Sequence, residues 1–374
     1  MLEIVLIIFV FAFAYVNGAN DISKGIATLV GGKILKPAHA IIWGTITTVA
    51  GALVGVAITG GLLKTFSSGI LSQPLSTTAF PMAVTIGAAA WVLFATRTGL
   101  PVSTTHALTG SIIGAALAQI GGSGIVWKIL IQKIALPLAL SPVISFSLAW
   151  LIFPLIRYAL ASVNNYCLCL EVRQTQLLPI PQAAGTVAIT STPFQSPALQ
   201  VVADQVETCE QTVSRRGVKL RVADSLHLLT SGLTSFSRGL NDTPKIAALL
   251  IGTSLLGGEG TFKIFGLVAI GMCIGSLLGG RKVLETMSGK ITAMDGIEGF
   301  TANFGASALV TVATFLSLPL STTHVTTSAI VGIGVRSHGR ANWKVVRDIL
   351  LAWLVTLPTA AVVAYLASFI LKQI

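Results

Sequence analysis

The hydrophobic pattern of this chain consists of long apolar runs separated by short polar or glycine-rich breaks. They lie at about residues 2–30, 38–62, 82–96, 100–120 and 129–156, then at about 226–256, 262–279, 300–316, 318–335 and in a last segment ending near Lys372. A membrane-spanning helix needs roughly 20 apolar residues. A transmembrane barrel would instead show alternating segments of about 10 residues. The pattern therefore predicts helices embedded in a bilayer.

Two of these runs carry polar residues where a membrane helix is normally apolar. The first interruption is Asn17-Gly18-Ala19-Asn20-Asp21, and the second lies around residues 238–242. Carboxylates inside a membrane are costly and are functional by default. We expect both helices to be broken near the middle of the membrane at these positions.

The same two motifs occur in both halves of the chain, in the same order. Residues 100–106 read LPVSTTH, and 218 positions later residues 318–324 read LPLSTTH. The segment NDISK at 20–24 matches NDTPK at 241–245. Two motifs repeated in one order indicate a duplicated unit.

The chain divides into three parts. We expect a first membrane repeat at residues 1–156, a cytoplasmic polar linker at 157–223 and a second, inverted membrane repeat at 224–374. The linker is rich in Pro, Gln, Ser and Thr and lacks periodicity, which predicts a disordered or loosely helical segment without a catalytic role. Its Cys167-x-Cys169 pair lacks the other ligands of a zinc site. We expect unpaired thiols.

The composition indicates an integral membrane protein. Of the 374 residues, 53% are hydrophobic and 10% are charged, with a mean hydropathy of +0.84. Soluble domains carry about 25% charged residues. The net charge of +11 is attributed to basic residues in cytoplasmic loops, so no nucleic-acid partner is expected.

The distribution of basic residues predicts an orientation. With the N-terminus outside and five crossings per half, 16 of the 24 Lys and Arg residues fall on the cytoplasmic side. This asymmetry favours that orientation over its inverse. Five is odd, so the two halves face opposite ways, as in the inverted repeats of secondary transporters. The predicted fold is an all-α polytopic membrane protein with two homologous, inverted halves and broken or re-entrant helices.

The STTH segments predict an anion site. Pro, Ser and Thr favour the first turn of a helix, and a helix that begins inside the membrane presents free N–H groups and a positive dipole end. The alternative is that the hydroxyls bond the preceding helical turn. The candidate ligands are Ser103, Thr104, Thr105, Ser321, Thr322 and Thr323.

The Asn-Asp motifs are candidates for coupling transport to a cation. Carboxylate and amide oxygens at a helix break suit a hard cation such as sodium. Alternatively, a Lys three residues further along the helix neutralises each Asp. His106 and His324 either accept a proton or are neutral side chains bonded to a neighbouring helix. The candidate coupling residues are Asn20, Asp21, Lys24, His106, Asn241, Asp242, Lys245 and His324, with possible sodium at Asp21 and Asp242 and no other metal.

The paired Gly-x-Asn-Asp segments, the paired Pro-x-Ser-Thr-Thr-His elements and the long polar middle loop resemble the inorganic phosphate transporter (PiT) family. The resemblance covers both halves but not the linker. It implies a cation-coupled symporter, commonly driven by sodium and sometimes by protons, that moves phosphate through inverted repeats. It further implies that the Ser and Thr residues at 103–105 and 321–323 bind phosphate. By the same resemblance, the Asn-Asp pairs at 20–21 and 241–242 form the cation sites.

The chain departs from the family pattern in the Asn-Asp motifs. Lys24 and Lys245 replace a second Asn, Leu240 and Pro244 replace Ala, and Arg238 precedes the second motif. A fixed ammonium group repels sodium or takes its place. We hypothesise that the lysines compensate the aspartates or bind the anion, with proton coupling as the alternative.

The expected function is import of inorganic phosphate by a secondary active transporter. Sulfate or another tetrahedral oxyanion is the alternative substrate, because hydroxyls and helix ends distinguish the two poorly. A passive anion channel and an intramembrane aspartyl protease are the other classes, and no Walker-type loop indicates drive by ATP. We expect no enzyme activity and no cofactor beyond coupling Na⁺ or H⁺. The expected partners are inorganic phosphate, that cation and the lipid bilayer of the plasma (inner) membrane, with a homodimer left open.

Overall fold

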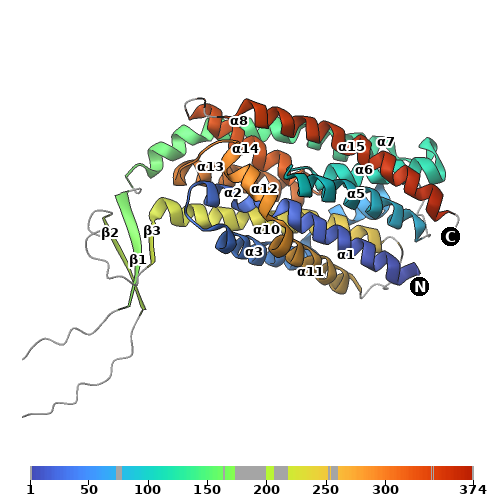
Figure 1. Ribbon diagram of the computed structural model, residues 1–374, viewed down its shortest axis with the longest axis horizontal. Helices are drawn as coiled ribbons and strands as arrows, with labels where there is room; N and C mark the ends of the chain where they lie inside the picture. Colours follow the sequence, from blue (N-terminus) through green and yellow to red (C-terminus); the bar gives the residue numbers. More distant parts are fainter. Residues whose placement is uncertain are drawn as a thin grey trace, which may run out of the picture.

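The apolar runs of both halves form helices (Figure 1). The computed structural model describes residues 2–72, 78–162, 165–172, 199–205, 218–251, 253, 260–337, 339 and 341–372. The first half contains α1 (Leu2–Asp21), α2 (Ser23–Gly31), α3 (Pro37–Ile58), α4 (Gly60–Lys64), η1 (Thr65–Gly69), α5 (Ala79–Thr98), α6 (Thr104–Ile120), η2 (Gly122–Gly124), α7 (Trp127–Ile129), η3 (Leu130–Ala135) and α8 (Leu136–Leu160). The second contains α10 (Val222–Ile251), α11 (Thr261–Gly279), α12 (Arg281–Glu285), η6 (Thr286–Lys290), α13 (Gly296–Phe315), α14 (Thr322–Arg336) and α15 (Trp343–Leu371).

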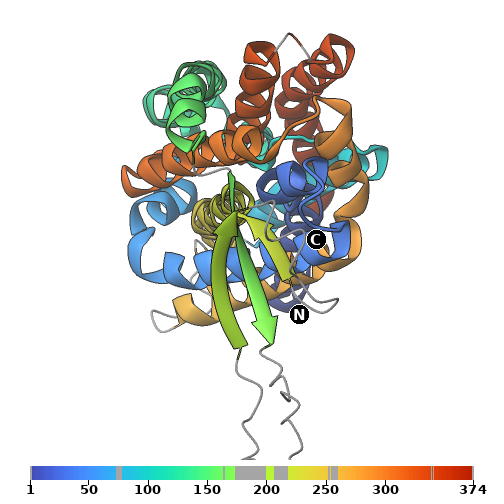
Figure 2. The same cartoon turned by 90° about the vertical axis from the view of Figure 1, so that its left-hand side faces the viewer.

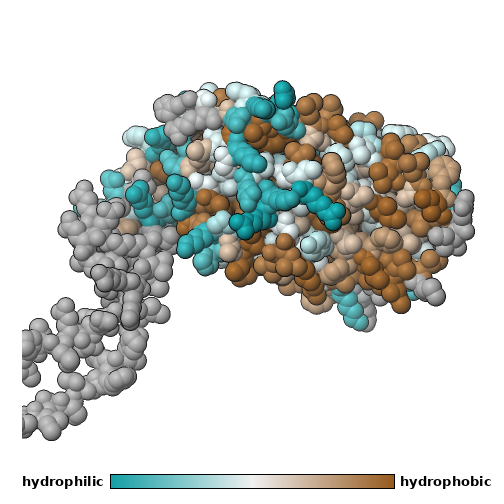
Figure 3. Space-filling view, in the orientation of Figure 1, coloured by the Kyte–Doolittle hydropathy of each residue, from teal (hydrophilic) through white to brown (hydrophobic). Residues whose placement is uncertain are grey.

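Six of the described helical segments are long and apolar enough to cross a membrane. They are Leu2–Gly31, Pro37–Ile58, Ala79–Thr98, Trp127–Leu160, Thr261–Gly279 and Trp343–Leu371. Large hydrophobic side chains project outward from several of them, with Leu155 and Leu354 more than two-thirds exposed. Figure 3 shows hydrophobic residues over much of the end away from the linker. The molecule therefore has the surface of an integral, multi-pass membrane protein.

Part of the linker forms a small antiparallel sheet. Strand β1 (Tyr166–Val172) lies between β2 (Leu199–Gln205) and β3 (Val218–Arg221). The expectation of a disordered or loosely helical linker is therefore wrong for these residues, and an otherwise helical structure contains one small sheet, because short strands from distant parts of the linker pair through their backbones. The thiol prediction is wrong for Cys167, which is disulfide-bonded. Sequence spacing does not show which thiols a fold brings together. Of the rest of the predicted linker, residues 157–160 continue α8 and residues 222–223 begin α10, while 163–164, 173–198 and 206–217 lie outside the described residues.

The chain termini lie at the opposite end of the helix bundle from this sheet (Figures 1 and 2). Placing the N-terminus outside and the linker inside requires the C-terminus to be outside as well. The positions of the termini fit an odd number of crossings in each half, whichever side of the membrane the linker occupies.

The expected breaks in the two motif helices are largely absent. Helix α10 continues through residues 238–242 without interruption. Between α1 and α2, only Ile22 separates the helices, and its backbone still has helical φ and ψ. The helices tolerate these polar residues because their side chains find partners on other helices, so the backbone does not need to open. Pro244 lies inside α10 and cannot donate to the carbonyl of Leu240.

Each STTH segment follows a helical hairpin turn. Helix α5 ends at Gly99 and α13 ends near Ser317, and both turn residues have a left-handed backbone with φ of 77° and 58°. An extended stretch then leads into α6 or α14. Both of these helices start at the predicted Thr, directly after Ser103 and Ser321. The turn positions are 218 residues apart, which matches the spacing of the motifs.

The two halves exchange helix partners. Helix α1 packs on α11, and α10 packs on α3. At the crossings, a Cβ built on Gly18 would lie 2.1 Å from the carbonyl oxygen of Met272, and one on Gly239 would lie 2.1 Å from that of Thr48. In the same way, α6 packs on α15 and α14 packs on α8. Each half thus completes the packing of the other around the STTH helices.

Candidate functional site

The six predicted anion ligands are buried together where α6 and α14 begin. Their exposed fractions range from 0% at Ser103 to 6% at Thr104, so none faces lipid. Ser103 accepts a hydrogen bond from the backbone N–H of His106 at 3.1 Å, and Ser321 accepts one from His324 at 3.2 Å. These serines are N-caps and hold the first helical turns in place.

The third residue of each Ser-Thr-Thr run reaches into the other half. The hydroxyl of Thr105 donates to the carbonyl of Leu320 at 3.2 Å, and Thr323 donates to the carbonyl of Val102 at 2.7 Å. The accepting residue in each case lies in the extended stretch before the other helix. The two helix starts are therefore bonded to each other.

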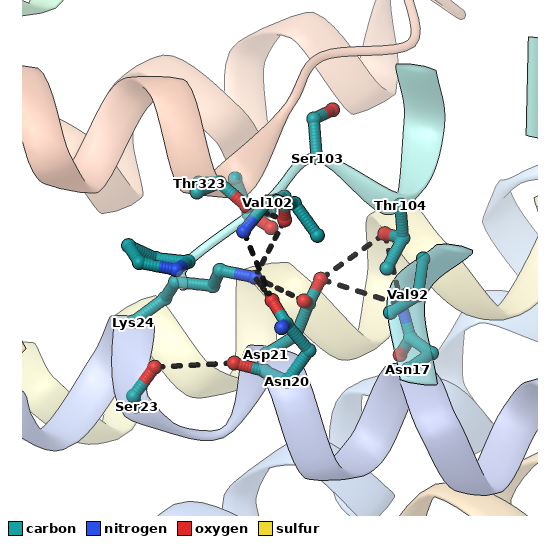
Figure 4. Close-up of polar contacts among 12 residues, drawn as sticks. Asn17, Asn20, Asp21, Ser23, Lys24, Val92, Val102, Ser103, Thr104 and Thr323 are labelled. Atoms are coloured by element: carbon teal, nitrogen blue, oxygen red, sulfur yellow. Dashed lines mark hydrogen bonds and ion pairs between the residues drawn. The ribbon is translucent and has the colours of Figure 1, made fainter. Parts of the chain in front are cut away.

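Helices α1 and α2 place a polar cluster beside the start of α6 (Figure 4). Lys24 forms an ion pair with Oδ1 of Asp21. Oδ2 of the same carboxylate accepts hydrogen bonds from Thr104 at 3.1 Å and from Asn17 at 3.3 Å. Lys24 also donates to Oδ1 of Asn20 at 3.1 Å and to the carbonyl of Val102 at 3.3 Å. Both oxygens of Asp21 thus have donors within the chain.

Helix α10 places a corresponding cluster beside the extended stretch before α14. Lys245 donates to Oδ1 of Asp242 at 3.0 Å, to the hydroxyl of Thr105 at 2.8 Å and to the carbonyl of Leu320 at 2.9 Å. Asn241 donates to Oδ1 of Asp242 at 3.1 Å and to the same carbonyl at 2.9 Å. Among the described residues, Oδ2 of Asp242 has no hydrogen-bond partner. The alternative of an Asp–Lys pair is therefore realised in both halves.

The two predicted histidines form a pair with each other. The rings of His106 and His324 have centroids 4.6 Å apart, and the ring of Trp353 lies 3.9 Å from that of His324. Both histidines line a cavity of about 240 Å³ together with Thr109 and mostly apolar side chains. In the described part of the chain, Nδ1 of His106 and Nε2 of His324 have no partner. Each histidine therefore has one buried ring nitrogen without a fixed hydrogen-bond partner among the described residues.

One residue of the buried cluster, Arg238, is not among the site residues predicted from the sequence. Arg238 was noted only as a departure from the family pattern, yet its side chain is one of the largest that is fully buried. Its Nη2 donates to the hydroxyl of Thr48 at 2.9 Å. Its charge interacts with those of Asp21 and Asp242, although neither carboxylate lies within ion-pair distance. The spacing in the sequence could have identified it, because Arg238 precedes Asp242 by one helical turn and so lies on the same helix face.

The carboxylates differ in how well they suit a sodium ion. Around Asp21, the ammonium of Lys24 and the two neutral donors already occupy both oxygens. Around Asp242, one oxygen is free, but Lys245 holds the other. Among the described residues there is no group of three or more His, Cys, Asp or Glu side chains able to hold a metal ion. Each of the two aspartates is thus already paired with a lysine.

The chain matches known proteins over nearly its whole length. The sequence model described as "Phosphate transporter family" matches residues 17–364. A probable low-affinity inorganic phosphate transporter of Rhizobium meliloti is 30% identical over 365 residues, covering 96% of this chain and 92% of that protein. A probable low-affinity inorganic phosphate transporter of Bacillus subtilis is 29% identical and covers 100% of this chain and 98% of its own length.

A solved structure shares the fold. The protein described as the sodium-dependent phosphate transporter superposes with a TM-score of 0.77 at 24% identity, covering 100% of this chain and 99% of that one. The matching family and relatives are transporters, which confirms the expectation that the chain is not an enzyme. The same matches indicate an integral, multi-pass membrane protein, and the plasma membrane is the usual location of such transporters.

Proposed function

The chain belongs to the phosphate transporter family, and on that basis we propose that it is a secondary active transporter importing inorganic phosphate as a cation-coupled symporter. The single observation that supports this most strongly is the meeting of the two STTH helix starts. Helix N-termini and hydroxyl groups favour anions. Here two of them are joined by the Thr105–Leu320 and Thr323–Val102 hydrogen bonds in a buried location.

An inverted repeat is part of this proposal. The units are residues 1–156 and 224–374, joined by the linker at 157–223. Helices α6 and α14 have 17 and 15 residues, which at 1.5 Å per residue is shorter than the roughly 30 Å hydrocarbon core. Helices that begin partway across the membrane fit the broken-helix sites of secondary transporters. Exchanged packing between equivalent helices supports the same plan.

The proposed substrate is phosphate rather than sulfate. Near neutral pH phosphate carries a proton that it can donate to a carboxylate, whereas sulfate carries none and a carboxylate only repels it. The buried cluster contains two carboxylates, Asp21 and Asp242, close to the helix starts. The proposed phosphate ligands are the Ser and Thr residues at 103–105 and 321–323.

Proton coupling is the second candidate for the driving ion, and one observation favours it. Lys24 and Lys245 are ion-paired with the two aspartates to which a sodium site was assigned. The His106–His324 pair supplies titratable ring nitrogens in the same region. We propose that the lysines replace sodium in the two halves and that proton movement drives uptake.

Uptake into proteoliposomes tests both parts of the proposal. Labelled phosphate and labelled sulfate are supplied separately, each with an imposed sodium gradient, an imposed proton gradient or neither. We expect phosphate to accumulate against its gradient and to depend on the proton gradient. Uptake that only equilibrates phosphate would indicate a channel. Accumulation that needs sodium would show that the lysines do not replace it, and a Lys24→Asn variant with unchanged ion dependence and affinity would remove any role of Lys24 in coupling.

A further inference from the structure

The buried cluster carries one positive charge more than it can neutralise. The buried basic side chains Lys24, Lys245 and Arg238 interact with the buried acidic side chains Asp21 and Asp242, and by formal charge this leaves one positive charge unmatched. The two lysines are paired with the two aspartates, so the unmatched charge is that of the arginine. Burying a charge without a partner is strongly unfavourable. The arrangement calls for an anion next to Arg238.

Free hydrogen-bonding groups lie on the same helix face as this charge. Nε and Nη1 of Arg238 have no acceptor among the described residues, and Oδ2 of Asp242 has no donor there. These residues are four apart on α10, so their side chains project from one face. Both side chains are at least 98% buried. One face of α10 therefore offers two donors and one acceptor that the protein itself does not use.

The equivalent position in the first half is closed. Asn17 precedes Asp21 by four residues, as Arg238 precedes Asp242, and Asn17 donates to both Asp21 and Thr104. Thr104 also donates to Asp21. In the second half, the corresponding oxygen of Asp242 receives neither bond. A ligand that both accepts and donates hydrogen bonds therefore finds its complement only in the second half.

Resting on the proposed function, we propose that Arg238 and Asp242 form the part of the site that selects a protonated oxyanion. Nη2 of the guanidinium uses one hydrogen on Thr48, and its second hydrogen forms a planar fork with either Nε–H or Nη1–H, a geometry that suits tetrahedral oxyanions. Oδ2 of Asp242 accepts the hydrogen of a P–OH group, while Lys245 donates to Oδ1 of the same side chain. Phosphate and arsenate carry such a hydrogen near neutral pH. Sulfate does not, and its oxygens are repelled by the carboxylate.

Competition binding to the full-length protein in detergent tests this proposal without any substitution. Labelled inorganic phosphate is displaced by unlabelled phosphate, arsenate or sulfate at neutral pH, in sodium and in choline salts. We expect arsenate to compete about as well as phosphate and sulfate at least tenfold more weakly. Loss of one charge-assisted hydrogen bond corresponds to roughly a tenfold to hundredfold change in affinity. Equal competition by sulfate would overturn the proposal.

Three variants locate the effect. Arg238→Gln should weaken phosphate binding roughly tenfold to a hundredfold, and Arg238→Lys should recover part of it because the charge returns without the planar fork. Asp242→Asn should lower the ratio of phosphate to sulfate affinity at least about tenfold. The matched control is Arg281→Gln, which removes an exposed arginine. Each purified variant is first shown to melt within a few degrees of the original protein.

The outcomes separate this proposal from the proposed function. If the original protein neither binds nor transports phosphate, the proposed function fails. If it transports phosphate but all three variants keep its affinity and its phosphate-to-sulfate ratio, only the roles of Arg238 and Asp242 fail. They also fail if Asp242→Asn changes the sodium dependence alone, because the free oxygen then belongs to a cation site.

Discussion

The packing of the two motif helices repeats closely, whereas their polar contacts do not. A Cβ built on Gly18 or on Gly239 would lie 2.1 Å from a carbonyl oxygen of the partner helix in both cases. One helical turn from the aspartate, however, the first half has Asn17 and the second has Arg238. In the first cluster both oxygens of Asp21 have donors and, among the described residues, Oδ1 of Asn17 stays unpaired, whereas the second cluster keeps two unpaired donors on Arg238 and one carboxylate oxygen on Asp242. The helix packing at these positions is thus alike in the two halves, and the polar chemistry differs.

This difference assigns structural support and ligand recognition to different halves, whereas in a symmetric site both halves would do both. The cluster around Asp21 fixes the start of α6 through Thr104 and the extended stretch through Val102. The cluster around Asp242 leaves groups available for a ligand. We infer that the first half mainly holds the site together and that the second half mainly recognises what binds there.

Removing a lysine should have the largest effect on stability. Lys245→Met leaves Asp242 buried with only Asn241 as a donor, so we expect the free energy of unfolding to fall by about 3–5 kcal/mol. Lys24→Met should cost about 1 kcal/mol less, because Asp21 keeps the donors Thr104 and Asn17. Unfolding by SDS in detergent micelles measures both.

The charge-neutral double variants serve as controls for this comparison. Asp242→Asn with Lys245→Met, and Asp21→Asn with Lys24→Met, remove both charges of a pair and should recover most of the loss. If each double variant is as unstable as its single lysine variant, the loss comes from packing rather than from an unpaired carboxylate. Equal losses for the two lysine variants would contradict the difference between the halves.

The glycine crossings should give the next largest effect, equal in the two halves. A methyl group at Gly18 or Gly239 meets a backbone oxygen, which cannot move aside as a flexible side chain can. We expect Gly18→Ala and Gly239→Ala each to cost about 1–3 kcal/mol by forcing the helices apart. Thermal melting in detergent measures this effect.

Gly266 provides the matched control, because it lies on α11, which packs against α1, and has no atom within 4 Å of a built Cβ. Gly266→Ala should be neutral or stabilising by up to about 1 kcal/mol, since Ala favours a helix. A large cost at Gly18 with none at Gly239 would mean that the scaffold is not symmetric after all.

Much of the fold could be predicted because the signals are local. Apolar runs gave the helices within a few residues, and Pro followed by Ser-Thr-Thr located the starts of α6 and α14. The exchange of helix partners between the halves could not be predicted, because it depends on contacts between residues about 180 positions apart or more, such as Ser145 and Val325. The sheet in the linker was not predicted because its strands have only four to seven residues and lie far apart in a segment otherwise rich in Pro, Gln, Ser and Thr.

The candidate site could be predicted as a set of residues but not as an arrangement. The STTH and Asn-Asp motifs could be identified because each occurs twice. Repetition, however, selects only residues that the two halves share. Arg238 differs between the halves, so the comparison of repeats treated it as a departure rather than as a member of the site. The expected helix breaks failed for a related reason. Partners such as Thr104 for Asp21 come from distant helices, and they satisfy the polar side chains while the helix stays intact.

Substituting the two threonines that donate hydrogen bonds to the other half should have the smallest effect on the free energy of unfolding. The two substitutions should also differ slightly from each other. Valine has the shape of threonine without the hydroxyl. Thr323→Val removes one donor to the carbonyl of Val102 and should cost about 1 kcal/mol. Thr105→Val also removes one of the three acceptors of Lys245, and a hydrogen bond from a charged group is worth more, so we expect about 2 kcal/mol. Chemical unfolding in micelles distinguishes the two values. Equal costs would mean that Lys245 finds another acceptor at once, and the second cluster would then be less constrained than its contacts indicate.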